Sequence, residues 1–280
     1  MLSPAKSKRL LVVTDLDGTL LDEQTYSYEL CLPALRRLRA SEIPIVMCST
    51  KTSAEMLSLW RDLDLGAPFI CESGGAIYFP RSYLRVPLPG LKTEEDFEVL
   101  ELGGDIIHLR RALADTARDC NVVVQSFGEM KIDEIAELTG LGLEQARLAS
   151  QRRYDEPFRV IYGEVEEIIV RLRVKKLTVT QGGSLYHLTA GHTKGDAVAR
   201  LLELHRRQYG ETIAIGLGNA ANDWPMLRQV EWPVLVKNPD GTWDATVVER
   251  MPNIHRTNGI GPQGWSEAIE RILDETAPST

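Results

Sequence analysis

Residues 10–22 read LLVVTDLDGTLLD, and this stretch decides how the rest of the chain is interpreted. Its first four residues form an apolar, partly β-branched run, which predicts a short buried strand followed by a polar loop. Asp15 and Asp17 open that loop. Because ligands of open α/β sheets bind outside the carboxyl ends of the strands, both carboxylates are expected at a functional site. Two carboxylates at this spacing are suited to hold a divalent cation, or to act as a nucleophile and its acid–base partner.

Two other interpretations of this loop are a calcium-binding loop and a simple polar turn. A calcium loop that begins at Asp15 needs glycine at its sixth position and glutamate at its twelfth, but those positions are Leu20 and Tyr26. The calcium interpretation therefore fails. A simple polar turn, with an aspartate as its cap, remains open when the motif is considered alone.

Strand-like and helical patterns alternate in the first and last thirds of the chain, which predicts a doubly wound α/β fold with a parallel sheet. The predicted elements are a helix at 29–41, a strand at 43–48, a helix at 53–65, strands at 69–71 and 76–79, a helix at 194–208, a strand at 212–217, a helix at 222–229, a strand at 232–236 and a last helix from 263.

The middle of the chain has a different pattern. Residues 80–93 are rich in proline and glycine, as in a linker. Beyond them, three helices interleave with short strands, and the last two strands form a hairpin turned at Gly182 and Gly183. Antiparallel pairing indicates a second sheet, and hence an inserted α+β domain. The predicted division is a core at 1–88, an inserted domain at 89–189 and the rest of the core at 190–280.

Composition excludes several classes of protein. The formal net charge of −8 argues against a broad nucleic-acid surface. The four cysteines are far apart, so neither a zinc knuckle nor a disulfide framework is expected. No apolar run has the ~20 residues of a membrane helix, and no signal peptide is recognisable. The expected compartment is a reducing cytoplasm, and whether the chain is a monomer or a homodimer stays open.

Two further motifs stand at predicted helix starts. Ser49, Thr50 and Lys51 follow a buried strand, where hydroxyls and backbone N–H groups suit a phosphate. A helix cap is the alternative for these hydroxyls. Lys194, at the start of the helix predicted at 194–208, has the point charge that a phosphate or a carboxylate would need, although a loop lysine is often simply solvated.

The stretch GLGNAAND at 216–223 allows two interpretations. It satisfies the loose G-x-G-x-x-A fingerprint of dinucleotide-binding folds, with Asp240 at a suitable distance, but such a fingerprint normally follows the first strand of its fold. Alternatively, Asn219 and Asp223 are oxygen donors for a cation.

In this order and spacing, the four motifs resemble those of the haloacid dehalogenase superfamily of aspartate-dependent phosphohydrolases. DLDGTLLD at 15–22 is similar to the first motif, Ser49 to the second, Lys194 to the third, and Asn219 with Asp223 to the fourth. The insertion has the position of the cap domain in the sugar-phosphatase branch. CSTKTSAE, ESGGAIY, QRRYDEPF and GHTKGDAV further resemble mannosyl-3-phosphoglycerate phosphatases, in a likeness that covers most of the chain.

The resemblance implies a Mg²⁺-dependent phosphomonoester hydrolase with a Rossmann-like core. Asp15 would be the nucleophile, Asp17 the acid–base group, and Ser49 and Lys194 the ligands of the phosphoryl group. The implied metal site uses Asp15, the backbone carbonyl of Asp17, and position 219, with Asp223 holding a metal-bound water or Lys194. This chain has Asn219 where the family usually has aspartate, so we expect weaker Mg²⁺ binding.

Substrate recognition is expected to fall largely to the inserted domain. The expected substrate-binding residues are Thr50, Lys51, Arg152, Gly183 and His187, with Arg152 facing the glycerate carboxylate. The implied substrate is mannosyl-3-phosphoglycerate, released as mannosylglycerate and phosphate. Another small sugar phosphate, such as glucosyl-3-phosphoglycerate, is the near alternative. A dinucleotide-binding protein or a non-catalytic member of the fold are the alternatives from other classes.

Overall fold

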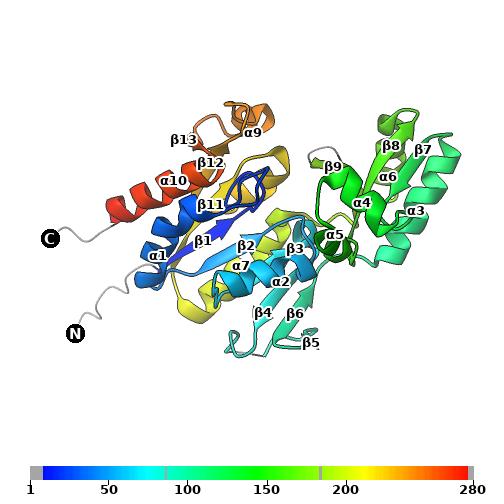
Figure 1. Cartoon of the computed structure of the whole chain (residues 1–280). Coiled ribbons are helices and arrows are strands. Elements are labelled where there is room, and N and C mark those ends of the chain that lie inside the picture. Colours follow the sequence, from blue (N-terminus) through cyan, green and yellow to red (C-terminus); the bar gives the residue numbers. More distant parts are fainter. Residues whose placement is uncertain (1–8, 86, 183–184, 277–280) are drawn as a thin grey trace.

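The computed structural model describes residues 9–85, 87–182 and 185–276. It contains a nine-stranded sheet and a separate four-stranded sheet. Figure 1 shows the smaller sheet and its helices to one side of the larger one. The α/β class predicted from the sequence, a core with an inserted domain, is confirmed.

Six parallel strands form the main part of the large sheet, in the order β13-β12-β11-β1-β2-β3. Their bounds are β1 (Arg9–Thr14), β2 (Ile45–Cys48), β3 (Phe69–Cys71), β11 (Thr212–Gly218), β12 (Trp232–Lys237) and β13 (His255–Ile260). Every residue of β2 is buried, as expected of a parallel strand whose two faces are both covered by helices.

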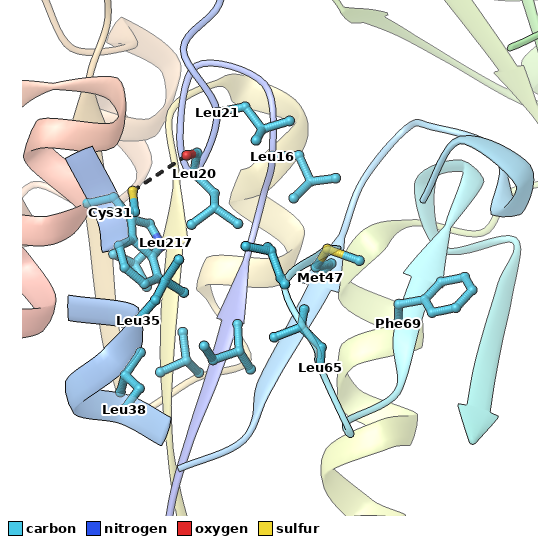
Figure 2. Packing of buried hydrophobic residues seen from close by; sticks show 14 of the residues in the cluster. Leu16, Leu20, Leu21, Cys31, Leu35, Leu38, Met47, Leu65, Phe69 and Leu217 are labelled. Atoms are coloured by element: carbon cyan, nitrogen blue, oxygen red, sulfur yellow. Dashed lines mark hydrogen bonds between the residues drawn. The ribbon is translucent and has the colours of Figure 1, made fainter. Parts of the chain in front are cut away.

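Helices pack on both faces of this sheet. They are α1 (Leu32–Ala40), α2 (Ser53–Asp62), α7 (Lys194–Tyr209), α8 (Trp224–Leu227), α9 (Ala245–Arg250) and α10 (Gly261–Thr276). Because side chains alternate along a strand, Val12 of β1 joins one apolar cluster, with Leu38, while Leu11 and Val13 join the cluster on the other face, with Leu201. Figure 2 shows the first cluster, in which Leu16 and Leu20 anchor the loop after β1 from beneath.

Three antiparallel strands extend the large sheet beyond β3: β4 (Ala76–Pro80), β6 (Phe97–Glu101) and β5 (Lys92–Glu94). The expected boundary at residue 88 falls inside this sheet, because β5 and β6 pair with the core. The strand predicted at 76–79 is β4, whereas β5 and β6 were not predicted. Lys92 and Glu94 are charged, and the proline-rich segment before them is typical of a linker.

The inserted body is an antiparallel sheet in the order β7-β8-β10-β9, covered by helices. Its elements are α3 (Ile106–Asp119), β7 (Val123–Ser126), α4 (Ile132–Thr139), α5 (Leu143–Ala149), β8 (Asp155–Tyr162), α6 (Val165–Val174), β9 (Thr178–Gly182) and β10 (Leu185–Thr189). Leu109 with Leu113, and Ile168 with Leu172, are spaced four apart, so each pair faces the sheet from one side of its helix.

The predicted hairpin is confirmed by the pairing of β9 with β10, whereas α4 was not predicted. Gly183, at the expected turn, lies outside the described residues. None of the helices in the described ranges has the length and apolar character needed to cross a membrane.

Candidate active site

The loop after β1 holds two carboxylates above the carboxyl end of the sheet. The backbone N–H of Asp15 donates to the carbonyl of Leu217 in β11, 2.9 Å away, so this residue still follows the sheet. Leu16 and Leu20 are fully buried beneath the loop. Gly18 has a φ of +69°, and a Cβ there would lie 2.5 Å from Asn219 Nδ2. Glycine therefore allows both the turn and the close approach of Asn219.

A buried lysine joins the first, third and fourth motifs. Lys194 Nζ lies 2.6 Å from Asp15 Oδ1 and 2.6 Å from Asp223 Oδ1. Lys194 is the first residue of α7, whose N-terminus is capped by Thr193 and Asp196 in a capping box. The other oxygen of Asp223 accepts the N–H groups of Asn219 and Ala220. These bonds fix the lysine between two carboxylates.

The charges of this buried group do not balance. Asp15 and Asp223 supply two negative charges, while Lys194 supplies one positive charge. Burial is the main cause that raises the pKa of Asp15 to about 7, and Asp223 raises it further, against the opposing effect of Lys194. Although burial by itself lowers the pKa of Lys194, the two carboxylates raise it well above its ordinary value. The site can therefore accommodate a further positive charge.

The second motif forms a loop between β2 and α2. The cap of α2 is Thr52, which forms a capping box with Glu55, so Ser49 and Thr50 are not needed for that purpose. Ser49 is buried, and its Oγ accepts the N–H of Lys51. Lys51 Nζ lies 3.0 Å from Asp17 Oδ1. Burial lowers the pKa of Lys51, but Asp17 and Glu55 more than offset this effect and raise it.

Asn219 lies directly after β11, as expected, and its side chain has an oxygen that could bind a cation. Its Oδ1 accepts a hydrogen bond from Thr19 Oγ1 at 3.1 Å, and its Nδ2 donates to Asn238 Oδ1 at 2.8 Å. In the described part of the chain, no three acidic, histidine or cysteine side chains converge in a way that could hold a metal ion. A cation at this place would therefore rely on amide and backbone oxygens as well as on Asp15.

Arg152 lies where the inserted body meets the second motif. Its guanidinium donates to the carbonyls of Thr50 and Ala149 at 2.6 and 2.8 Å, and Nη2 lies 3.8 Å from Glu55 Oε2. The side chain is almost completely buried. The structure thus places Arg152 beside the loop that carries Ser49, Thr50 and Lys51, with its hydrogen bonds directed at protein groups.

His187 lies on β10 of the inserted body and faces Asp155, the first residue of β8. Its Nδ1 is 3.0 Å from Asp155 Oδ1. Ser73, from the core, donates its hydroxyl to Asp155 Oδ2 at 2.9 Å. His187 was expected from the sequence, whereas Asp155 and Ser73 were not. The sequence signal that could have identified Asp155 is the acidic pair Asp155 and Glu156 in QRRYDEPF. Both side chains are fully buried in the structure.

The glycines of the GLGNAAND stretch have a packing role. A Cβ on Gly216 would lie 2.7 Å from Val230, and one on Gly218 would lie 2.6 Å from the side chain of Asp223. Both glycines are therefore needed to let β11 and the Asp223 turn approach closely. This accounts for the G-x-G spacing without a dinucleotide.

Residues 12–86, which include Asp15, match the haloacid dehalogenase-like hydrolase family. Two relatives, 37% and 34% identical, match over 94% and 95% of the chain, and the chain belongs to this family. It is an enzyme, a phosphatase of the family.

Two curated relatives bear the same name, glucosyl-3-phosphoglycerate/mannosyl-3-phosphoglycerate phosphatase. The protein from Methanococcoides burtonii is 37% identical over 265 residues, which cover 94% of this chain and 97% of the relative. The one from Persephonella marina is 34% identical and covers 95% and 98%. Among solved structures, a haloacid dehalogenase-like hydrolase from Bacteroides thetaiotaomicron has a TM-score of 0.66 at 19% identity, covering 95% of this chain and all of that one. At this identity the structure supports the fold alone.

Proposed function

We propose that this phosphatase hydrolyses the phosphate ester of a glycosyl-3-phosphoglycerate, with the mannosyl compound as the first candidate and the glucosyl compound as the second. The observation that carries the reaction is the buried contact of Lys194 with Asp15 and Asp223 at the carboxyl end of the parallel strands. The substrate rests on the names of two relatives that match over almost the whole chain.

In the proposed first step, an Asp15 carboxylate oxygen attacks phosphorus and the bond to the leaving oxygen breaks, which gives an aspartyl-phosphate. Protonated Asp17 gives its proton to that leaving oxygen. Lys194 and Ser49 bind the transferring phosphoryl group. Because the pKa of Asp15 is raised to about 7, its attack depends on nearby positive charge that keeps it ionised.

In the second step, Asp17 has given up its proton and is a carboxylate, 3.0 Å from Lys51 Nζ through its Oδ1. It takes a proton from a water molecule, whose oxygen attacks the phosphorus of the aspartyl-phosphate. The phosphorus–oxygen bond to Asp15 breaks, phosphate leaves, and Asp17 is protonated again. Both steps balance without any redox partner.

The residues present fit a divalent cation such as Mg²⁺. Asp15, the backbone carbonyl of Asp17 and the side chain of Asn219 would hold it, because these are the hard oxygen ligands it prefers. Asp223 would act through Lys194, which it contacts at 2.6 Å. When bound, the cation neutralises charge on the phosphoryl oxygens. One uncompensated negative charge in the buried group supports this proposal.

The reaction is proposed to take place in the cytoplasm, on a small phosphorylated sugar–glycerate. All four cysteines are unpaired, as expected of a reducing compartment.

The test is phosphate release, with and without Mg²⁺, from mannosyl-3-phosphoglycerate, glucosyl-3-phosphoglycerate and a panel of other sugar phosphates. Asp15→Asn is the blank, since it keeps the shape of the side chain and loses the nucleophile. We expect metal-dependent release from a glycosyl-3-phosphoglycerate that disappears in the variant. Faster release from an ordinary sugar phosphate would transfer the assignment to that substrate, and release that persists in Asp15→Asn would refute the mechanism.

A further inference from the structure

A buried charged pair connects two strands of the inserted body close to the core. Asp155 is fully buried and lies 3.0 and 3.1 Å from His187 Nδ1 through its two oxygens. Burial raises the pKa of Asp155, but His187, Arg152 and the Ser73 hydroxyl outweigh that effect and hold it below its ordinary value. Asp155 is therefore ionised and accepts a hydrogen bond from Nδ1–H. It follows that Nε2 is the nitrogen of His187 left for another partner.

That second nitrogen lies at the junction of the inserted body and the fourth motif. In the described part of the chain no hydrogen bond reaches Nε2. His187 Nε2 and Asn222 Nδ2 lie 3.2 and 3.9 Å from the point where a Cβ on Gly182 would stand. Asn222 Oδ1 is buried and has no partner. His187 Nε2, the Asn222 amide and Gly182 thus form a small polar site. Because Asn222 immediately precedes Asp223, this polar site lies next to the buried lysine site.

The three cationic side chains proposed for this region, those of Lys194, Lys51 and Arg152, already contact other protein groups. Lys194 contacts Asp15 and Asp223. Lys51 contacts Asp17. Arg152 directs its hydrogen bonds to backbone carbonyls and lies near Glu55. His187 differs from these side chains, because its Nε2 has no hydrogen-bond partner among the described residues.

We propose that His187, held by Asp155, binds the carboxylate of the substrate's glycerate part, with the Asn222 amide as a second donor. His187 and Asn222 are then specificity-determining residues, and Asp155 is a positioning residue. The inference rests on the proposed function and deepens it. In this arrangement Nε2–H donates to the substrate carboxylate while Nδ1–H donates to Asp155.

The core holds this pair in register with the phosphate-binding loop. Ser73 donates its hydroxyl to Asp155, and its N–H donates to the carbonyl of Ser49 at 3.0 Å. Glu72 and Ser73 both have positive φ, at +46° and +61°. Such backbone conformations are unfavourable for these residues and persist only where surrounding contacts enforce them. The distance between the carboxylate site and the phosphate site is therefore set by this strained turn.

The test compares two substrates that differ in one group: the glycosyl-3-phosphoglycerate, and the same phosphate ester with a hydroxymethyl group in place of the carboxylate. The quantity measured is the ratio of their kcat/KM values. We expect the wild type to favour the carboxylate by roughly 10- to 100-fold, as one charged hydrogen bond allows. His187→Gln should remove most of this preference through a higher KM for the carboxylate substrate.

Asp155→Asn should lower the ratio of the two kcat/KM values, because it removes the negative charge that holds the imidazole. Gly182→Ala should lower the same ratio, because its Cβ would occupy the space beside His187 Nε2 and Asn222 Nδ2. Asp155→Glu should restore part of the preference. The matched control is His108→Gln, an exposed histidine of α3, which should leave the ratio unchanged. A purely structural role of Asp155 would lower both kcat/KM values together and leave the ratio intact, which refutes the inference.

The two proposals fail in different ways. A wild type that hydrolyses other sugar phosphates but shows no preference for the carboxylate substrate overturns the proposed substrate, and this inference with it. A wild type that prefers the carboxylate, and keeps that preference in His187→Gln, overturns the inference alone.

Discussion

Replacing Glu72 with glutamine should make the protein relatively more stable as pH rises. Glu72, in the turn after β3, is fully buried. Its Oε2 accepts the N–H groups of Arg153, Tyr154 and Asp155 at 2.9, 2.8 and 3.0 Å, whereas its Oε1 is buried with no partner. Burial is the dominant cause that raises its pKa from 4.5 to about 7, against the opposing effect of Arg152 and of the backbone donors.

The sign and size of the effect follow from this pKa. Between pH 4.5 and about 7, the folded protein holds a proton on Glu72 that the unfolded chain has released. The free energy of unfolding therefore falls as pH rises through that window. The full shift corresponds to about 3 kcal/mol. Glutamine keeps the size of the side chain and its acceptor oxygen but does not titrate, so this pH-dependent loss disappears.

The measurement is urea-induced unfolding of the wild type and Glu72→Gln at pH 4.5 and pH 8. The free energy of unfolding of the variant, relative to that of the wild type, should rise by about 3 kcal/mol between the two pH values. Glu249→Gln, on the exposed surface of α9, corrects for the loss of one negative charge. A relative stability that is the same at both pH values would mean that Glu72 is ionised in the fold, and that its three backbone donors outweigh burial.

The remaining predictions concern the buried lysine site and its rim. Asn219→Asp should lower the Mg²⁺ concentration needed for half-maximal phosphate release, by roughly tenfold or less, since it adds one negative ligand; equal metal dependence would contradict the role given to this residue. Lys194→Ala should reduce kcat/KM at saturating Mg²⁺ by roughly 10³-fold or more, because Asp15 and Asp223 lose their shared cation; a loss under tenfold would contradict it. Arg152→Ala should lower the free energy of unfolding by about 2–4 kcal/mol, since a buried charge contact and two hydrogen bonds are removed; unchanged urea denaturation would show that these contacts contribute little.

Local sequence patterns were sufficient for five of the six parallel strands of the core; β13, whose sequence HRTNGI has no apolar run, was not predicted. β2 is an uninterrupted apolar run because both of its faces are covered, and such runs are recognisable without a partner. The candidate site followed from the same logic, since Asp15 and Asn219 each end a buried strand and must meet at one edge of the sheet. β5 and β6 were missed because both are short and carry charged residues; β6 pairs with β4, and β5 pairs with β6 at the edge of the sheet.

Contacts between distant segments could not be predicted from local patterns. Arg152 was expected to face substrate, yet its guanidinium donates to Thr50, 102 residues away in sequence. Asp155 and Ser73 are 82 residues apart and belong to different bodies. Their pairing depends on how the inserted body is seated on the core, and no spacing in the sequence encodes that.

The charge of the site explains why asparagine is tolerated at position 219. With Asn219, the buried group of Asp15, Asp223 and Lys194 carries one excess negative charge, and with aspartate it would carry two. Asn219 contacts Asn238 through its Nδ2, so an aspartate would bring an oxygen against Asn238 Oδ1 unless the Asn238 amide turned over to donate. That rotation also changes the bond from Asn238 Nδ2 to the carbonyl of Asn219. Asparagine at position 219 thus keeps both hydrogen bonds with Asn238, but it attracts a cation less strongly than aspartate would. The contact of Lys194 with Asp15 involves neither amide.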